Sequence, residues 1–169
     1  MREAAGGLGV RGRAERLRPA LDAALDLPAM ARAAVGPARW AAATEAERAD
    51  LAAAFADWTV AVYASRFTGY SGERFETLGS DPAPADASAR LVRTRLLRPD
   101  PAAAPVPLTY LLRRAPDGGG RWRAHDIYLG GTISEIATRR AEFAAPLRDG
   151  GPARLAADLR ARAATLLAT

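Results

Sequence analysis

The chain has 169 residues, of which 49% are hydrophobic and 25% are charged, close to the averages of globular domains. Such a chain can bury a core, so wholesale disorder is excluded and one domain is expected. All 24 basic residues are arginine, and the sequence contains neither lysine nor cysteine. Disulfides, thiolate nucleophiles, Schiff-base lysines and the Walker A phosphate loop are therefore excluded.

A metal centre built on several histidines is also excluded, because His125 is the only histidine. The formal net charge is +5, but acidic residues are mixed with the arginines along most of the chain. A nucleic-acid-binding protein would more often show a concentrated basic stripe or a recognition motif. The densest basic segments, residues 11–18 and 90–98, are interpreted as solvated faces. The composition predicts no metal, no cofactor and no nucleic-acid partner.

The chain shows no targeting or membrane-spanning pattern. No segment approaches the roughly 20 consecutive apolar residues that cross a bilayer. Residues 1–7 lack the apolar core of a secretory signal. Taken alone, these features favour a soluble cytoplasmic protein.

The first part of the chain predicts short helices. Residues 1–15 lack apolar periodicity and are expected to form a flexible tail, followed by a single domain over residues 16–169. Leucines at every fourth position of residues 17–25 predict the first helix of this domain. A second helix opens with Asp26 as its N-cap and ends at the Gly-Pro pair of residues 36–37.

A long helix is predicted from Thr44 to about Phe67, because Thr44 and Glu47 have the spacing of a capping box. Its apolar side chains gather on two opposite sides. One side carries Leu51, Phe55, Trp58 and Val62, and the other carries Val60, Tyr63 and Phe67. A surface helix needs one apolar stripe. This helix is therefore predicted to lie between a core and a second apolar surface, either a neighbouring helix or a cavity.

Extended segments follow. Four strands are predicted at residues 75–78, 90–97, 106–113 and 122–129, and Asp117 with the three following glycines joins the last two as a hairpin. Alternation places Leu108, Tyr110 and Leu112 on one face of the third strand. In the fourth strand it places Ile127 and Leu129 on one face and Trp122 and Tyr128 on the other.

The chain ends in helices again. Ser134 is the expected N-cap of a helix that ends at Gly150 and Gly151, and Pro152 opens the last helix. The order of helices, antiparallel sheet and helices predicts an α+β fold, with a four-stranded curved sheet packed by N- and C-terminal helices.

No residue pattern supports catalysis. His125 and Asp126 are neighbours on a strand, so their side chains point to opposite faces and cannot form a dyad. Ser71 lacks the flanking glycines of a nucleophile elbow. Ser134 and Glu135 are explained by helix capping and by the helix dipole.

Several segments, in the order and spacing found here, resemble the MlaC-like, or toluene-tolerance, family of periplasmic lipid-binding proteins over about residues 16–165. They are Leu25-Asp26-Leu27-Pro28-Ala29-Met30-Ala31-Arg32 with Val35-Gly36 and Trp40, Thr44 to Phe67 with Tyr70-Ser71-Gly72 and Phe75, and Trp122 with Asp126-Ile127. The closing segment, Gly131 to Ala137 with Arg139-Arg140 and Glu142-Phe143, looks most like the hopanoid-associated HpnM branch, because Arg139-Arg140 replaces the family's usual Tyr-Arg pair.

This resemblance implies a non-enzymatic, monomeric carrier in the periplasm. It would hold a phospholipid or a hopanoid-type lipid in an apolar cavity and exchange it with membrane-embedded transport complexes of the inner and outer membranes. The side chains expected to line the cavity are Trp58, Val62, Tyr63, Phe67, Leu91, Leu108, Tyr110, Leu112, Ile127, Leu129 and Phe143. Arg139 and Arg140 are expected at the cavity mouth, where they would meet an anionic head group or a partner.

Two alternatives remain open from the residues alone. One is a small cone-shaped α+β enzyme that uses Asp126 as a base in its cavity. The other is a non-catalytic adaptor whose aromatic side chains fill a solid core.

Overall fold

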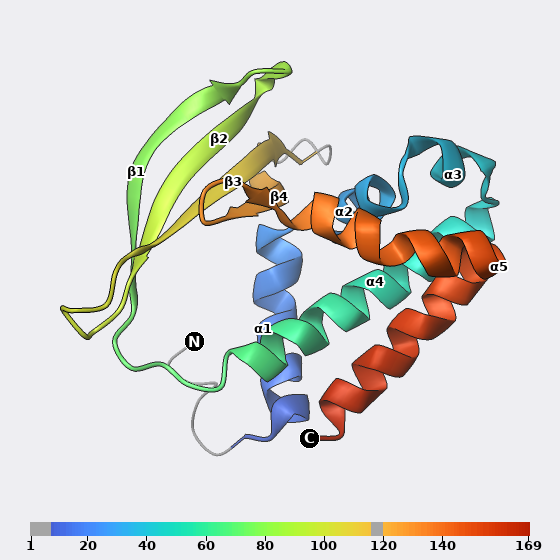
Figure 1. Ribbon diagram of the computed structural model, residues 1–169, viewed down its shortest axis with the longest axis horizontal. Helices are drawn as coiled ribbons and strands as arrows, with labels where there is room; N and C mark the ends of the chain where they lie inside the picture. Colours follow the sequence, from blue (N-terminus) through green and yellow to red (C-terminus); the bar gives the residue numbers. More distant parts are fainter. Residues whose placement is uncertain (1–7, 116–119) are drawn as a thin grey trace. The chain divides into compact units, whose positions relative to one another are not determined.

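The computed structural model describes residues 8–115 and 120–169 (Figure 1). The chain forms two compact units. The helical unit spans the residues up to 23 together with 27–70 and 139–169, and the sheet unit spans residues 24–26 and 71–138. The single domain over residues 16–169 and a cavity between sheet and helices stay predictions. None of the described helices is long and apolar enough to cross a membrane.

The helical unit contains a short helix, α3 (Pro37–Ala42), that the sequence analysis did not predict. Its elements are α1 (Val10–Ala24), α2 (Leu27–Val35), α3, α4 (Glu45–Arg66) and most of α5 (Glu135–Leu167). Gly36 ends α2 with a φ of 90°, which favours glycine. Pro37, expected only to break the chain, begins α3, because its fixed φ suits a first helical position.

The start of α1 corrects the boundary of the expected tail. The helix begins at Val10, so residues 10–15 are helical, and the side chains of Val10 and Ala14 are buried. Two apolar side chains four residues apart share one face of a helix and stabilise it by burial. The first part of the expected tail, residues 1–7, lies outside the described residues.

Helix α4 is buried on more than one side, as predicted. Thr44 accepts a hydrogen bond from the Glu47 N–H at 3.2 Å, and the Glu47 carboxylate accepts one from the Thr44 N–H at 2.8 Å, which completes the capping box. The four successive residues 58–61 are all buried. Four consecutive positions of a helix face all around its axis. Within its unit α4 therefore has neighbours on several sides, among them α1, whose Arg13 Nε donates to the Ala64 carbonyl at 2.9 Å.

The sheet unit is an antiparallel meander. Its strands follow chain order as β1 (Arg74–Ala83), β2 (Asp86–Leu97), β3 (Val106–Arg114), β4 (Trp122–Leu129) and β5 (Ile133–Ser134). The four predicted strands are confirmed, β1 is longer than expected, and the two-residue β5 makes a fifth strand. The predicted glycine hairpin falls largely on residues 116–119, which lie outside the described residues.

Two glycines divide α5, as predicted from the sequence. Gly150 and Gly151 have non-helical backbone angles, and Gly151 combines a φ of 66° with a ψ of −160°. This region of backbone space is open almost only to glycine. The chain therefore changes direction here, and Pro152 restarts the helix.

Replacing Thr44 with Ala removes one half of the capping box. We expect the free energy of unfolding to fall by about 1 kcal/mol, because the Glu47 N–H loses its side-chain acceptor. Urea unfolding at pH 7 measures the change. Thr68→Ala, at an exposed position just beyond α4, serves as the control, and an equal loss in both variants would contradict the role of the cap.

Candidate functional site

The register of the sheet brings five of the predicted lipid contacts onto one face. Side chains of directly paired residues lie on the same face of an antiparallel sheet. Tyr110 pairs with Ile127, and Leu108 pairs with Leu129. We call this side of the sheet the apolar face. The predicted residues on it are Leu108, Tyr110, Leu112, Ile127 and Leu129.

Leu91 does not belong to this group, contrary to the prediction. It pairs with Leu111, whereas its neighbour Val92 pairs with Tyr110. Successive side chains alternate between the faces of a sheet. Leu91 therefore lies on the opposite face, and Val92 takes the position on the apolar face that Leu91 was expected to occupy.

Trp122 also lies on another face than predicted, because alternation along the strand placed it on the face opposite to Ile127. Leu111 pairs with Asp126 and Leu112 pairs with Ala124, so His125 is an extra residue in a β-bulge. A bulge shifts the alternation by one residue. Trp122 consequently pairs with Arg114 on the apolar face, and the Arg114 guanidinium lies 4.9 Å from the centre of its ring.

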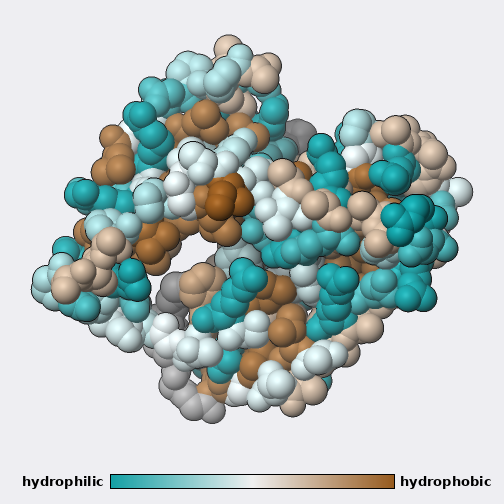
Figure 2. Space-filling view, viewed as in Figure 1, coloured by the Kyte–Doolittle hydropathy of each residue, from teal (hydrophilic) through white to brown (hydrophobic). Residues whose placement is uncertain are grey.

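The apolar face extends further than the sequence predicted. Phe75 pairs with Leu96, which pairs with Val106, and Leu129 pairs with Ile133. Phe75, Leu129 and Ile133 remain 58%, 41% and 61% exposed, and hydrophobic side chains reach the surface over β2 to β4 (Figure 2). Exposed apolar residues that share one face typically mark a binding surface. The alternation of Val92, Thr94 and Leu96 with arginines was the sequence signal for this extension.

The opposite face of the sheet is charged, and we call it the polar face. Arg93 lies 3.0 Å from Asp81, and Arg95 lies 2.6 Å from Glu76. The hydrogen bond from Arg95 holds the pKa of Glu76 below its ordinary value. The sheet thus presents two chemically different surfaces, one able to contact hydrocarbon and one carrying paired charges.

In the helical unit, three predicted contacts lie near the C-terminal end of α4. Val62 and Tyr63 are half-buried, and Phe67 is 40% exposed. The rings of Tyr63 and Phe67 are 5.5 Å apart. This end of α4 keeps apolar and aromatic surface that the helical unit does not fully cover.

Trp58 and Phe143, predicted to line a cavity, are buried among aromatic side chains of the helical unit. Phe143 is 1% exposed, and its ring lies 5.8 Å from that of Trp58 and 6.2 Å from that of Phe55. These edge-on contacts are favourable geometries for aromatic pairs. The lining of a cavity by these two residues stays a prediction.

Arg139 and Arg140 also make contacts within the helical unit. Arg139 is buried, its guanidinium lies 4.5 Å from the ring centre of Trp58, and its Nη1 donates to Glu142 at 2.9 Å. Its place at a cavity mouth stays a prediction. Arg140 is exposed, and its Nη2 donates to the carbonyl of Ala33 at 2.7 Å, which ties α5 to the last turn of α2.

The carboxylate of Asp126 organises the start of α5. It accepts hydrogen bonds from the N–H groups of Ile127 and Ile136, at 2.8 and 3.1 Å, and from the Ser134 hydroxyl at 2.6 Å. Ser134 in turn caps the helix by accepting from the Ala137 N–H. With three hydrogen bonds to its own surroundings, buried Asp126 is built as a structural residue and not as a base.

His125, the residue added by the bulge, faces a different carboxylate. Its Nε2 lies 3.4 Å from Oδ2 of Asp26, at the start of α2. Burial lowers the pKa of His125, while Asp26 opposes this shift. Among the described residues, no group of three or more His, Asp or Glu side chains could hold a metal ion.

The model of the family described as MlaC protein matches residues 5–161 of this sequence. The chain belongs to the MlaC family. Proteins of this family are lipid-binding carriers and not enzymes, which argues against an enzyme that uses Asp126 as a base. No curated protein matches the chain.

One solved structure shows that the fold of this MlaC-family chain is shared. It is a phospholipid-binding protein from Ralstonia solanacearum in complex with a phospholipid. The match has a TM-score of 0.75 and 21% sequence identity, and it covers 97% of this chain and 87% of the other.

Asp126→Ala tests the structural role of this carboxylate. The change leaves the N–H groups of Ile127 and Ile136 without their acceptor, and we expect a loss of about 3 kcal/mol in the free energy of unfolding. Asp81→Ala, which removes an exposed ion pair, is expected to cost less than about 1 kcal/mol. Urea unfolding compares the two variants, and unchanged stability of Asp126→Ala would contradict this role.

The lowered pKa of His125 predicts that acid weakens the fold. Below its ordinary pKa of 6.5 the unfolded chain binds a proton more readily than the folded one, so the free energy of unfolding falls as the pH drops from 7.5 towards 5.5. His125→Gln should remove this component. Urea unfolding across that range measures it, and the same slope in both proteins would refute the assignment.

Proposed function

We propose that this protein is a periplasmic carrier that holds the apolar part of a phospholipid or a hopanoid-type lipid against the apolar face of its sheet. The proposal rests on one observation. Apolar side chains from all five strands meet on the apolar face, where Phe75, Leu129 and Ile133 remain exposed. A soluble domain rarely leaves such a surface uncovered unless it binds something. The phospholipid in the Ralstonia structure supports the ligand class.

The physical chemistry of transfer agrees with this role. Burying one CH₂ group from water is worth about 0.8 kcal/mol, so a sixteen-carbon chain requires shielding on the order of 10 kcal/mol. A bilayer supplies the same shielding. A carrier surface must therefore match the membrane closely, so that the lipid neither stays in the membrane nor stays on the protein.

The proposed lipid contacts follow from the geometry of each unit. In the sheet unit they are Leu108, Tyr110, Leu112, Ile127 and Leu129 with Val92 and Leu96. In the helical unit, Val62, Tyr63 and Phe67 are proposed for the uncovered end of α4. On the polar face, Arg93 and Arg95 are held in ion pairs, which keeps their charges away from the hydrocarbon.

The proposal also concerns the identity of the lipid. The segment Gly131 to Ala137 and the Arg139-Arg140 pair favour the hopanoid-associated branch, so a polycyclic lipid is proposed beside a phospholipid. Exchange with membrane-embedded complexes of the inner and outer membranes completes the carrier role.

Organic extraction of the purified protein followed by mass spectrometry tests the ligand. We expect one lipid class to co-purify, a glycerophospholipid or a polycyclic triterpenoid. Recovery of no lipid, together with no uptake from labelled liposomes, would overturn the carrier function.

Variants of two adjacent leucines, one on each face of the sheet, test in the same experiment which face binds the lipid. Leu112→Arg places a charge on the apolar face, and we expect lipid recovery to fall by about tenfold or more, because an unpaired cation is poorly solvated by hydrocarbon. Leu111→Arg makes the same change on the polar face and is the matched control, since both leucines are half-buried. Equal lipid recovery from the two variants would refute the assignment of the face.

A further inference from the structure

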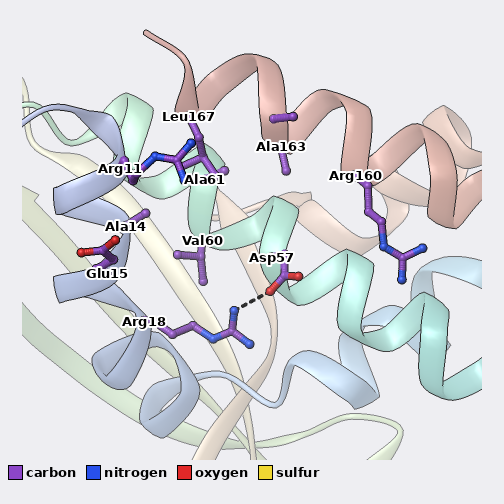
Figure 3. Close-up of a pocket in the computed structure, with 11 residues that line it drawn as sticks. Arg11, Ala14, Glu15, Arg18, Asp57, Val60, Ala61, Arg160, Ala163 and Leu167 are labelled. Carbon is purple, nitrogen blue, oxygen red and sulfur yellow. Dashed lines mark hydrogen bonds and ion pairs between the residues drawn. The ribbon is translucent and has the colours of Figure 1, made fainter.

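The helical unit carries an open cleft of about 460 Å³ that shares no residue with the apolar face. Helices α1, α4 and the second half of α5 line it (Figure 3). Its floor is made of small apolar side chains with low exposure, namely Ala14, Val60, Ala61 and Ala163. The volume falls in the range of small-molecule pockets, roughly 300–1,000 Å³.

The charges on the rim are unevenly compensated. Arg18 donates to Asp57 at 2.6 Å and to Asp22 at 2.9 Å, and Arg160 pairs with Asp50. Arg11 forms no ion pair with any described residue, and its side chain extends from α1 towards α4 and α5 (Figure 3). Glu15 also lines the cleft, but no ion pair joins it to Arg11. One end of the cleft therefore holds a cation that no ion pair with a described residue neutralises.

The net charge of the helical unit is also positive. The helical unit contains fifteen arginines and ten acidic residues, whereas the sheet unit contains nine of each. The whole net charge of +5 thus belongs to the helical unit. A positive field around a cleft raises the local concentration of anionic ligands.

We propose that this cleft binds a single-chain anionic amphiphile, with its phosphate or carboxylate at Arg11 and its alkyl chain on the floor of Ala14, Val60, Ala61 and Ala163. The head group takes the Arg11 end because Asp57 repels an anion at the Arg18 end. A guanidinium binds phosphate or carboxylate with two parallel hydrogen bonds. The alanine methyl groups leave the room that the chain occupies.

Octyl phosphate is the probe, titrated into ¹⁵N-labelled full-length protein and followed by amide chemical shifts. We expect saturable shifts at Ala14, Ala61 and Ala163. Inorganic phosphate and octylammonium should each bind about tenfold or more weakly, because one lacks the chain and the other lacks the anion. Equal binding of either compound would overturn the amphiphile as ligand.

Two pairs of variants locate the site. Arg11→Glu should weaken octyl phosphate binding by about tenfold or more. Arg162→Glu makes the same charge change at an exposed position of α5 that does not line the cleft, and it should leave binding within about twofold. Ala164→Phe fills the cleft and should abolish the shifts, whereas Ala161→Phe, exposed and outside the cleft, should not.

The same titration separates this site from the proposed lipid surface. Chemical-shift changes confined to residues 108–112 would overturn the proposed binding site in the cleft and leave the carrier function intact. If Leu112→Arg loses lipid but binds octyl phosphate normally, the two sites are independent. The last experiment measures binding of the protein to phosphatidylglycerol vesicles. If vesicle binding depends on Arg11 and octyl phosphate causes no saturable shifts, the ligand at Arg11 is a membrane surface and the proposal is overturned.

Discussion

Backbone hydrogen bonds between β2, β3 and β4 determine which side chains this protein can offer to a lipid. Because side chains alternate across a sheet, a slip of one residue would exchange the apolar face for the polar one. The bulge at His125 makes one such exchange locally and brings Trp122 to the apolar face. The carboxylate of Asp126, next to the bulge, ties β4 to the start of α5 and so holds this geometry in place.

The helical unit depends on α4 in a comparable way. An alanine-rich helix allows neighbouring helices to approach closely, and α4 is covered around most of its circumference. Trp58 belongs to the resulting core with Phe55 and Phe143, and stacking against Trp58 gives buried Arg139 a favourable electrostatic partner. The same alanines that allow close approach in the core leave a hollow where α1, α4 and α5 diverge.

Hydrocarbon and charge are arranged differently in the two units. In the sheet unit the ion pairs of Arg93 and Arg95 stand on the polar face, and the unit has no net charge. In the helical unit the net charge is +5, and Arg11, which has no ion pair among the described residues, borders the cleft. Ion pairing suits the sheet unit, because an apolar surface next to unpaired charge shields a lipid chain poorly.

The sequence alone determined the elements that depend on local chemistry. The capping box of Thr44, the glycine break at Gly151, the alternating strands and the two-sided burial of α4 are all set by neighbouring residues, and all were predictable. The tertiary structure decided what depends on distant partners: the face of Leu91, the bulge that moves Trp122, the burial of Phe143 and the contacts of Arg139. These depend on strand register and helix packing, which are set by the total free energy of many remote contacts and which leave no mark at a single position of the sequence.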